Sequence, residues 1–306
     1  MKSIRTVIAS SALLAIALTG CTPNAGTGAS TSDEPLIVQF VPTRTEEDMQ
    51  AQAQPLADLL SEQLNREVEV SIATDYSTII EAMSSGQVDV GIMPPASYVL
   101  ANDAGAAEAI LQAQIPGTDP ETAAALPDKL VDGFRGEILV RADSNINSID
   151  DLRGKVIAAQ SAASASGYIF PMVEISDQGI DINQDLTVTT VAGIDSSILA
   201  VLDGSVDAAF SFEGGRRLLQ NDIPDITDQI RVLYLTEALI PNDAIAVNSQ
   251  LDEETKQAVT DAFLAIAADP EGLEIVTSLY SHLGYVPADE AAYDIVRDYI
   301  ARASEL

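Results

Sequence analysis

The chain has 306 residues, of which 47 are acidic and 15 are basic, and its formal net charge at pH 7 is −32. No basic stripe is present that could neutralise the phosphates of a nucleic acid, so the composition argues against a nucleic-acid partner. An anionic ligand would gain no long-range steering from such a protein and would have to be held by local dipoles.

The first 20 residues have the pattern of a bacterial signal peptide. Lys2 and Arg5 form a short basic region, residues 7–17 are apolar and small, and Leu-Thr-Gly precedes Cys21. The apolar run is too short for a permanent membrane span. The spacing is that of a lipobox, in which Cys21 becomes the first mature residue and carries the lipid. Because Cys21 is the only cysteine, we prefer this interpretation to an ordinary cleaved signal with a stray cysteine.

In the segment 21–34, the residues that follow the cysteine are small and polar. This composition predicts a flexible tether. Folding is therefore expected to start near Pro35. The remaining ~270 residues are enough for two lobes of common domain size. No later segment is long and apolar enough to cross a membrane.

Hydrophobic periodicity predicts alternating strands and helices up to residue 100. Strands are expected at 36–40, 68–72 and 88–92, and helices at 49–64, at 77–84 and from Pro95 through Leu100. Thr78 and Glu81 have the spacing of a capping box. Residues 113–134 are less regular. This order predicts a mostly parallel sheet covered by helices.

The rest of the chain continues the alternation. Further strands are predicted at 136–140, 156–159, 187–191, 206–210, 231–235 and 244–247. Helices are predicted at 149–152, from Ser164, and near 196–202, 214–220, 253–268, 271–282 and 289–303.

Residues 76–89 and 194–207 form an internal repeat. Both segments read as loop, helix, Gly-x-Val-Asp and strand, although a chance match of two similar units is the alternative. Ligands of open α/β sheets bind beyond the carboxyl ends of the strands. The loops after Ile92 and Phe210 are therefore expected to open into one shared cleft.

Motifs along the chain carry a family resemblance. They are Thr74-Asp75-Tyr76, Gly86-x-Val-Asp-x-Gly, Pro95-x-x-Tyr98-Val99, Ile149-Asp150-Asp151-Leu152-Arg153-Gly154-Lys155, Ser164-x-Ser-Gly167-x-x-x-Pro171, Ala200-Val201-x-x-Gly204-x-Val-Asp207 and Ile240-Pro241-x-Asp243. Their order and spacing resemble the phosphate/phosphite/phosphonate-binding receptors of ABC importers, which have the type II periplasmic binding protein fold. The resemblance runs from Leu36 to about Arg297.

The resemblance implies an α/β protein of two lobes, with mixed, mostly parallel sheets and a two-strand hinge. Crossings are expected near 138–142 and 240–244. Lobe 1 would comprise residues 35–139 and 243–306, and lobe 2 residues 140–242. Closure about the hinge is the usual response to a ligand.

A helix start at Ser164 is the expected anion site. Its first amides, at Ala165 and Ser166, lack helical partners, and the helix dipole favours negative charge there. The two serine hydroxyls add donors without adding charge. Plain capping by Ser164 is the alternative from the residues alone, and the resemblance favours binding.

The resemblance assigns five further positions to the ligand. Tyr76 and Tyr98 would contact it from lobe 1, and Glu213 and Asp243 match the acidic pair that holds the amino group in aminoalkylphosphonate receptors. The chain departs from the family in having Ala165 where Thr is frequent and Ile194 where His is frequent. Each departure removes a donor to an oxyanion, which leaves the exact ligand open and makes an alkyl-bearing ligand plausible.

The sequence thus predicts an extracytoplasmic, lipid-anchored receptor whose partners are a small phosphonate- or phosphite-like oxyanion, ABC permease subunits and the membrane. A receptor for a sulfonate, a thiamine precursor or an iron chelate is an alternative, as is a surface lipoprotein acting as sensor or adhesin. An enzyme is not expected, because the only histidine, His282, falls on a late predicted helix away from any Ser-His-acid set. No cofactor or metal motif is present.

Overall fold

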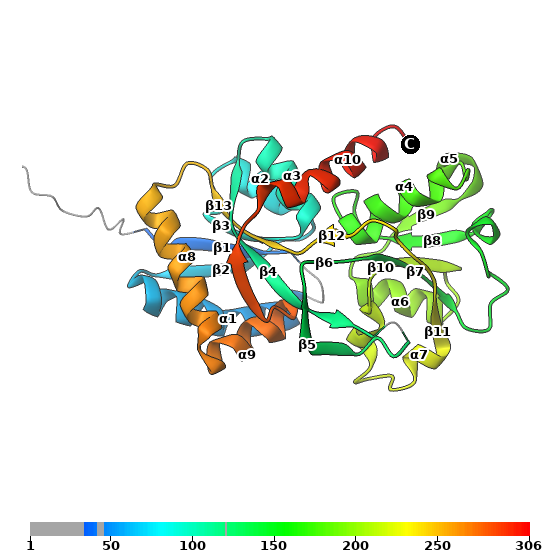
Figure 1. Ribbon diagram of the computed structural model, residues 1–306, viewed down its shortest axis with the longest axis horizontal. Coiled ribbons are helices and arrows are strands. Elements are labelled where there is room, and N and C mark those ends of the chain that lie inside the picture. The colour runs from blue at the N-terminus through cyan, green and yellow to red at the C-terminus, as the bar shows by residue number, and fades with distance from the viewer. Residues whose placement is uncertain (1–33, 42–45, 120) are drawn as a thin grey trace, which may run out of the picture. The chain divides into compact units, whose positions relative to one another are not determined.

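Two mixed β-sheets form the framework, and the apolar runs of the sequence supply most of their strands (Figure 1). The computed structural model describes residues 34–41, 46–119 and 121–306; the expected signal peptide and Cys21 lie outside these residues. The first sheet has seven strands in the order β14-β4-β13-β3-β1-β2, with β5 paired to β4. They are β1 (Leu36–Phe40), β2 (Val68–Ile72), β3 (Val90–Met93), β4 (Ala107–Thr118), β5 (Ala125–Val131), β13 (Ala244–Asn248) and β14 (Gly284–Pro287).

The second sheet has five strands in the order β11-β7-β10-β8-β9. They are β7 (Gly136–Arg141), β8 (Val156–Ala159), β9 (Thr187–Thr190), β10 (Ala208–Phe212) and β11 (Ile230–Leu235). A separate two-stranded pairing joins β6 (Gly133–Phe134) to β12 (Ile240–Pro241).

Helices cover both faces of each sheet (Figure 1). Alternate residues of each strand point to opposite faces, so each sheet faces two apolar clusters. On the first sheet these clusters are completed by α1 (Glu46–Leu64), α8 (Glu253–Ala268) and α9 (Pro270–Tyr280) on one face, and by α2 (Thr78–Ser84), α3 (Pro95–Asp103) and α10 (Asp294–Ala303) on the other.

The second sheet is covered in the same way. One face receives η1 (Ile149–Leu152), α4 (Phe170–Asp177) and α5 (Ile182–Asp185), and the other receives α6 (Ile194–Leu202), η3 (Gly215–Leu219) and α7 (Ile226–Gln229). The remaining turns are η2 (Ala165–Ile169), a π-helical turn that leads into α4, and η4 (Glu290–Tyr293), which precedes α10.

The mixed character of the sheets was expected, but the expectation that parallel pairs predominate is wrong. Parallel pairing is confined to β1 with β2 and β3, and to β8 with β9 and β10. The other described pairs are antiparallel. Strand–helix–strand units give parallel pairs, and only these segments are built that way. The strands reached by crossings or reversals of the chain pair in the opposite direction.

The segment 113–134 is more regular than predicted. It contains the end of β4 and the whole of β5, which form a hairpin. All residues of β5 except the last are exposed, so no hydrophobic alternation marks the strand. Pro116 and Gly117 near the end of β4 also resemble a loop in sequence.

The capping box predicted at Thr78 and Glu81 is also wrong. The helix α2 begins at Thr78, so Thr78 is already inside it. The Asp75 carboxylate accepts hydrogen bonds from the amides of Ser77 and Thr78, at 2.7 and 2.9 Å. A carboxylate two residues upstream can reach these amides without the hydroxyl that the sequence pattern suggested.

Sheet membership bears on the predicted lobe boundaries. The expected division between residues 139 and 140 falls inside β7, all of which lies in the five-stranded sheet. We therefore propose that the chain crosses between lobes at β6 and β12, a few residues earlier than expected on the first passage.

The C-terminal helix α10 contacts elements of both lobes. Its Tyr299 ring stacks on Phe170 of α4, with centroids 4.1 Å apart, and its hydroxyl donates to Glu174 at 3.1 Å. Glu174 is 4% exposed and also accepts from Tyr234 and from the amides of Glu237 and Ala238. A buried carboxylate with four donors ties α4 to the segment that leads to β12.

Candidate functional site

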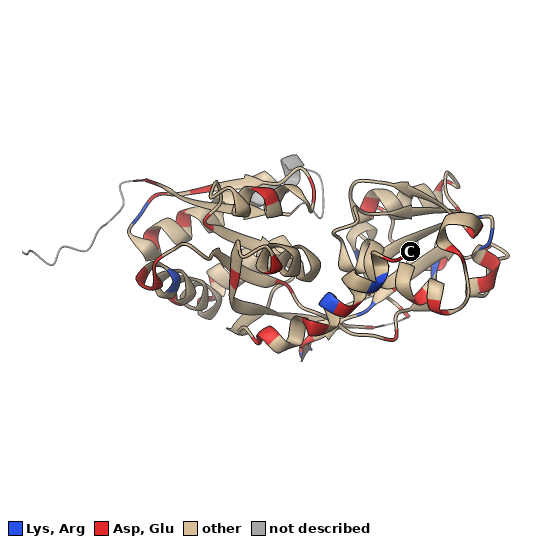
Figure 2. Ribbon diagram, turned by 90° about the horizontal axis from the view of Figure 1, so that it is seen from above, with Lys and Arg blue, Asp and Glu red and all other residues tan. Residues whose placement is uncertain are grey.

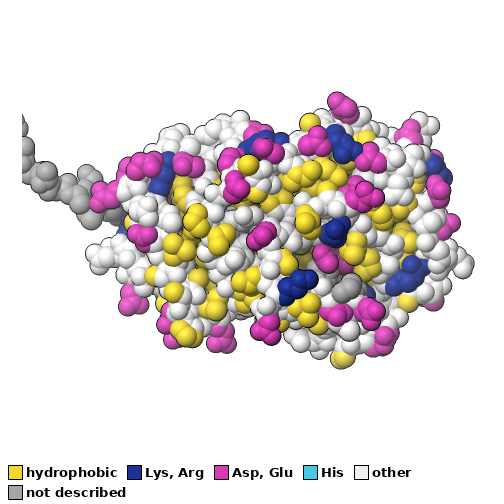
Figure 3. Space-filling model, in the orientation of Figure 1, with side chains coloured by type: hydrophobic (Ala, Val, Ile, Leu, Met, Phe, Trp, Pro, Cys, Tyr) yellow, Lys and Arg dark blue, Asp and Glu magenta, His cyan; other side chains and the backbone are white. Residues whose placement is uncertain are grey.

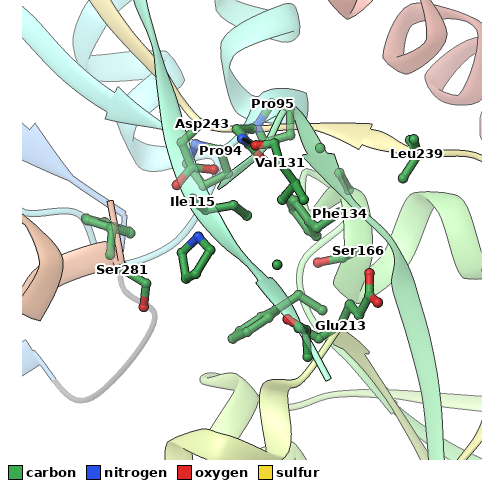
Figure 4. Close-up of a pocket in the computed structure, with 18 of the residues that line it drawn as sticks. Pro94, Pro95, Ile115, Val131, Phe134, Ser166, Glu213, Leu239, Asp243 and Ser281 are labelled. Carbon is green, nitrogen blue, oxygen red and sulfur yellow. Dashed lines mark hydrogen bonds between the residues drawn. The ribbon is translucent and has the colours of Figure 1, made fainter. Parts of the chain in front are cut away.

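A cavity of about 260 Å³ lies beyond the ends of β3 and β10 (Figure 4). Pro94 and Pro95 follow β3 and line it, as do Phe212 and Glu213 at the end of β10. The prediction that the loops after these two strands share a cleft is confirmed. The volume is just below the ~300–1,000 Å³ usual for small-molecule sites, which suits a small ligand.

The turn at Ser164 forms part of the wall. Ser164, Ala165 and Ser166 all line the cavity. Ser164 is the N-cap of η2, and its hydroxyl accepts from the amide of Gly167 at 3.2 Å, so the capping predicted as the alternative is present as well. The amides of Ala165 and Ser166 lie in the first turn, where no helical carbonyl is available to them.

Gly167 allows this turn to be so tight. A Cβ atom at Gly167 would lie 2.4 Å from Cγ of Gln160 and 2.8 Å from the Ser164 hydroxyl. Gln160 is itself fixed, since its amide nitrogen donates to the Ser197 hydroxyl at 2.8 Å and to the Gly193 carbonyl at 3.2 Å. Glycine at position 167 is therefore required by close packing beneath the cavity wall.

Tyr76 lines the cavity from the other lobe and is 8% exposed. Burial raises the pKa of Tyr76 to about 12; a hydrogen bond with the Ser164 side chain acts against this rise, and the Asp243 carboxylate adds to it. The Tyr76 hydroxyl therefore stays protonated at neutral pH and is a donor.

Two carboxylates of the cavity occupy different parts of its wall. In Figure 4, Glu213 lies with Ser166 on one side, and Asp243 lies near Pro94 and Ile115 on the other. Glu213 accepts from the backbone amide of Arg135 at 3.3 Å.

Asp243 follows β12 and contacts the only histidine. Its Oδ2 atom is 3.4 Å from Nε2 of His282, whose Nδ1 is 3.3 Å from the Tyr285 hydroxyl. His282 was expected on a helix, but α9 ends at Tyr280 and Ser281 adopts a left-handed φ of 60°. His282 therefore lies in the turn before β14, buried beside a cavity acid.

A third carboxylate lies behind the cavity. Glu137 of β7 is 1% exposed and accepts from the amides of Gly214 and Gly215, at 3.3 and 3.2 Å. Burial raises the pKa of Glu137 to about 7, and Arg216 and the two amides lower it only in part. This carboxylate holds the loop that carries Glu213.

Two of the predicted ligand positions do not line the cavity. Tyr98 is fully buried in α3; its hydroxyl donates to Glu290 and accepts from the amide of Ala109 at 3.3 Å. Ile194 is 2% exposed and packs in the apolar cluster under α6. The geometry gives neither residue a path to the ligand, whereas the other six predicted positions line one cavity.

The chain is similar to known proteins. The family model for "ABC transporter, phosphonate, periplasmic substrate-binding protein" matches residues 38–293. This chain belongs to that family. The phosphate-import protein PhnD of Mycolicibacterium smegmatis is 28% identical over 96% of this chain and 94% of its own length.

Solved structures share the fold. The binding-protein component of an ABC phosphonate transporter from Pseudomonas aeruginosa superposes with a TM-score of 0.76 and 20% identity, covering 89% of this chain and 87% of its own. PhnD1 of Prochlorococcus marinus in complex with methylphosphonate gives a TM-score of 0.72 at 15% identity, over 90% of this chain and 100% of its own.

Membership of the phosphonate-binding family implies an extracytoplasmic substrate-binding component that delivers a small ligand to permease subunits. Within the described residues, no helix has the length and apolar character of a membrane span. Over the same residues, no three His, Cys, Asp or Glu side chains are grouped so as to hold a metal ion.

Several polar residues of the cavity were missed by the sequence analysis, among them two cations and an asparagine. Arg217 and Lys129 bring positive charge to the cavity, whereas acidic residues are scattered along the ribbon in Figure 2 and over the face shown in Figure 3. Arg216 and Arg217 are the only adjacent basic residues in the sequence, which is a signal that could have been used. Lys129 had no signal, because the strand β5 was not predicted.

Asn242 is another missed residue. Its amide nitrogen donates to the carbonyls of Ala113 and Val131, at 3.0 and 2.7 Å. Its Oδ1 atom is buried and has no hydrogen-bond partner among the described residues. Asn242 lines the cavity, and its two hydrogen bonds tie β4 to β5 at the cavity wall.

Proposed function

We propose that the protein binds a phosphonate- or phosphite-like oxyanion in this cavity, with the Ser164 hydroxyl, the amides of Ala165 and Ser166 and the Tyr76 hydroxyl as donors. The observation that carries the proposal is that a first helical turn and a protonated tyrosine line the same wall region. All of these donors are neutral, which suits oxyanion binding in a chain of net charge −32.

The relatives support this ligand class. One related structure holds methylphosphonate, and the relative from Mycolicibacterium smegmatis is named as a phosphate-import protein. Ala165 and the buried Ile194 leave fewer side-chain donors than the family usually has. We therefore infer that an alkyl-substituted phosphonate binds better than inorganic phosphate.

A hydrogen-bond donor on the ligand would explain why two carboxylates, Glu213 and Asp243, line the cavity. Glu213 and Asp243 beside an anion site would repel a simple dianion, and low dielectric strengthens that repulsion. An ammonium group, as in 2-aminoethylphosphonate, would compensate these charges. A protonated phosphite oxygen is the competing account.

A thermal-shift panel tests the ligand class. A ligand that binds only the native state stabilises it by RT ln(1 + [L]/Kd), about 2.7 kcal/mol at a hundredfold excess over Kd. We expect a shift with at least one phosphonate, phosphite or phosphate ester. A shift for a sulfonate, a thiamine precursor or an amine alone, with none for any phosphorus compound, would overturn the proposal.

Calorimetry with Asp243→Asn tests the ammonium contact. We expect the affinity for 2-aminoethylphosphonate to fall by about 1.5–3 kcal/mol, because a hydrogen bond between charged groups is lost. Ethylphosphonate, which lacks the amine, should lose much less or gain. Equal losses for both ligands would show that Asp243 serves the oxyanion or the hinge.

Lipidation of Cys21 is a separate proposal about location. The ordered basic, apolar and Leu-Thr-Gly-Cys pattern supports it, and two or more acyl chains would make a stable anchor. Intact-mass analysis of the membrane-extracted protein should show acylated Cys21, and Cys21→Ser should release the protein from the membrane fraction. An unmodified Cys21 in the extracted protein contradicts the proposal.

A further inference from the structure

Two cations of the cavity have no carboxylate partner among the described residues. The Lys129 side chain makes neither a hydrogen bond nor an ion pair there, and the Arg217 side chain donates only to the Thr118 hydroxyl, at 3.2 Å, and lies over the Phe212 ring. The other two lysines of the described chain, Lys155 and Lys256, both have carboxylates within 4 Å. Among the described lysines, Lys129 alone therefore lacks an acid within 4 Å.

The absence of a carboxylate partner lowers the stability of the fold at Arg217, because this side chain is partly buried. Its side chain is partly buried, and burial lowers the pKa of the Arg217 guanidinium, although Glu137 and Glu213 act against that shift from a distance. A cation removed from water destabilises the fold unless a partner offsets its lost hydration. An anionic group on a ligand in the cavity would provide that partner.

The wall that holds these cations is built by different elements from the Ser164 turn. Lys129 lies on β5 and Thr118 at the end of β4, in the hairpin missed from the sequence. The Thr118 hydroxyl donates to the Glu213 carbonyl at 3.3 Å, and Gln220 donates to the Thr122 carbonyl at 2.8 Å. The hairpin is thereby fixed against the segment that carries Arg217.

The glycines of this wall keep the cations close to it. A Cβ atom at Gly214 would lie 2.5 Å from Cγ2 of Thr118 and 2.8 Å from a terminal nitrogen of Arg217. A Cβ atom at Gly117 would lie 3.3 Å from Cδ of Lys129, so the lysine stem packs over bare backbone. Both cations are held at the cavity by this packing.

We propose that Lys129 and Arg217 form a second anion subsite, and that the ligand is a phosphonate that carries a second anionic group. The inference rests on the proposed function, which places the phosphonate at the Ser164 turn. Glu213 and Asp243 remain available for an ammonium group. A phosphonate with an amino-acid end would therefore offer its phosphonate to the Ser164 turn, its carboxylate to the two cations and its ammonium group to the two acids. The cavity of about 260 Å³ leaves room for more than one tetrahedral group.

Calorimetry with matched probes tests the subsite in the purified full chain. The probes are 3-phosphonopropionate, propylphosphonate, which lacks the carboxylate, and methylenebisphosphonate, whose second anion is a phosphoryl group. We expect the wild type to bind one of the two doubly anionic probes about tenfold or more tightly than propylphosphonate. Which of the two binds more tightly identifies the second anion as carboxylate or phosphoryl.

The double substitution Lys129→Gln with Arg217→Gln should abolish this preference and leave propylphosphonate binding within about twofold of wild type. Lys129→Gln alone, which breaks no side-chain hydrogen bond or ion pair of the described residues, should remove part of this preference. This single variant guards against misfolding of the double variant. Lys155→Gln removes the same charge from a half-buried lysine outside the cavity and should leave this preference unchanged.

Two results would overturn the proposal of a second anion subsite. One is a wild type with no preference for either doubly anionic probe while propylphosphonate binds. The other is an equal loss for propylphosphonate and the doubly anionic probes in the double variant, which would place the cations at the phosphonate itself. If no phosphorus compound binds at all, the proposed function fails together with the subsite.

Discussion

The two repeat segments fold alike at one end and differ at the other. In the first copy, the Asp89 carboxylate accepts from the amide of Ile37 at 2.9 Å; in the second, Asp207 accepts from the amide of Val156 at the same distance. The turn glycines, Gly86 and Gly204, both have a left-handed φ, of 72° and 81°. The Gly-x-Val-Asp motif is thus a scaffold that ties each helix to its parallel strand pair.

The other ends of the copies have different roles. Tyr76 begins the first copy and lines the cavity, whereas Ile194, at the same place in the second, is buried in the core. The copy whose backbone faces the cavity has a hydroxyl-bearing side chain, Tyr76, at this position. The copy whose backbone faces a sheet has an apolar side chain, Ile194. The same backbone unit therefore supplies a candidate ligand contact in one lobe and core packing in the other.

The loops after the copies also differ. Pro94 and Pro95 follow the first copy and start α3 directly. Gly214 and Gly215 follow the second, and their amides are held by the buried Glu137. The second loop therefore depends on a titratable group, and the first does not.

Glu137→Gln tests this difference and should give the largest effect. The pKa of Glu137 is raised to about 7 from 4.5 in the folded state, so the folded protein binds more protons than the unfolded chain between these values. Glu137 therefore lowers stability as pH rises from about 4.5 to 7, by about 3 kcal/mol in total. Urea unfolding should show this loss in the wild type and not in the variant.

The control for this measurement is Glu62→Gln, which removes a negative charge from an exposed helix position. Its stability should follow the wild type across the whole pH range. If the difference between Glu137→Gln and wild type is the same at pH 5 and pH 8, the carboxyl does not titrate in that window and the account of the loop is wrong.

The shared scaffold is tested by Asp89→Ala and Asp207→Ala. Each should lower the free energy of unfolding by about 1–3 kcal/mol, because a backbone amide loses its acceptor. The corresponding asparagine variants keep an acceptor oxygen and should lose less. Chemical denaturation of the four variants measures this, and a large loss in only one lobe would show that the two motifs are not equivalent.

The smallest effects distinguish the diverged positions. Tyr76→Phe should weaken methylphosphonate binding by about 0.5–1.5 kcal/mol or more, because one donor is removed. Ile194→Val should leave the affinity unchanged and lower the stability by about 0.5–1.5 kcal/mol, as a core methylene is lost. Calorimetry and denaturation of both variants measure this. A weaker affinity in Ile194→Val than in Tyr76→Phe would reverse the assignment.

Most helices and strands could be predicted, because burial imposes a period on the sequence. The strands at 36–40, 68–72 and 156–159 and the helix at 253–268 were predicted with the bounds that the structure has. The exposed β5 was missed, since a strand that buries nothing carries no alternation. Lys129 was missed for the same reason, because β5 brings it to the cavity.

The sequence by itself determined most of the strands and helices in their order, the repeated Gly-x-Val-Asp scaffold, and a serine-rich turn that starts a helix at Ser164. These features depend on neighbouring residues, through periodicity, backbone conformation and close packing. Only the tertiary structure decided that Tyr98 and Ile194 are core residues, that most strand pairs are antiparallel, and that Arg217 and Lys129 share a cavity with Ser164. Such facts depend on contacts between residues far apart in the chain, and a local pattern does not contain them.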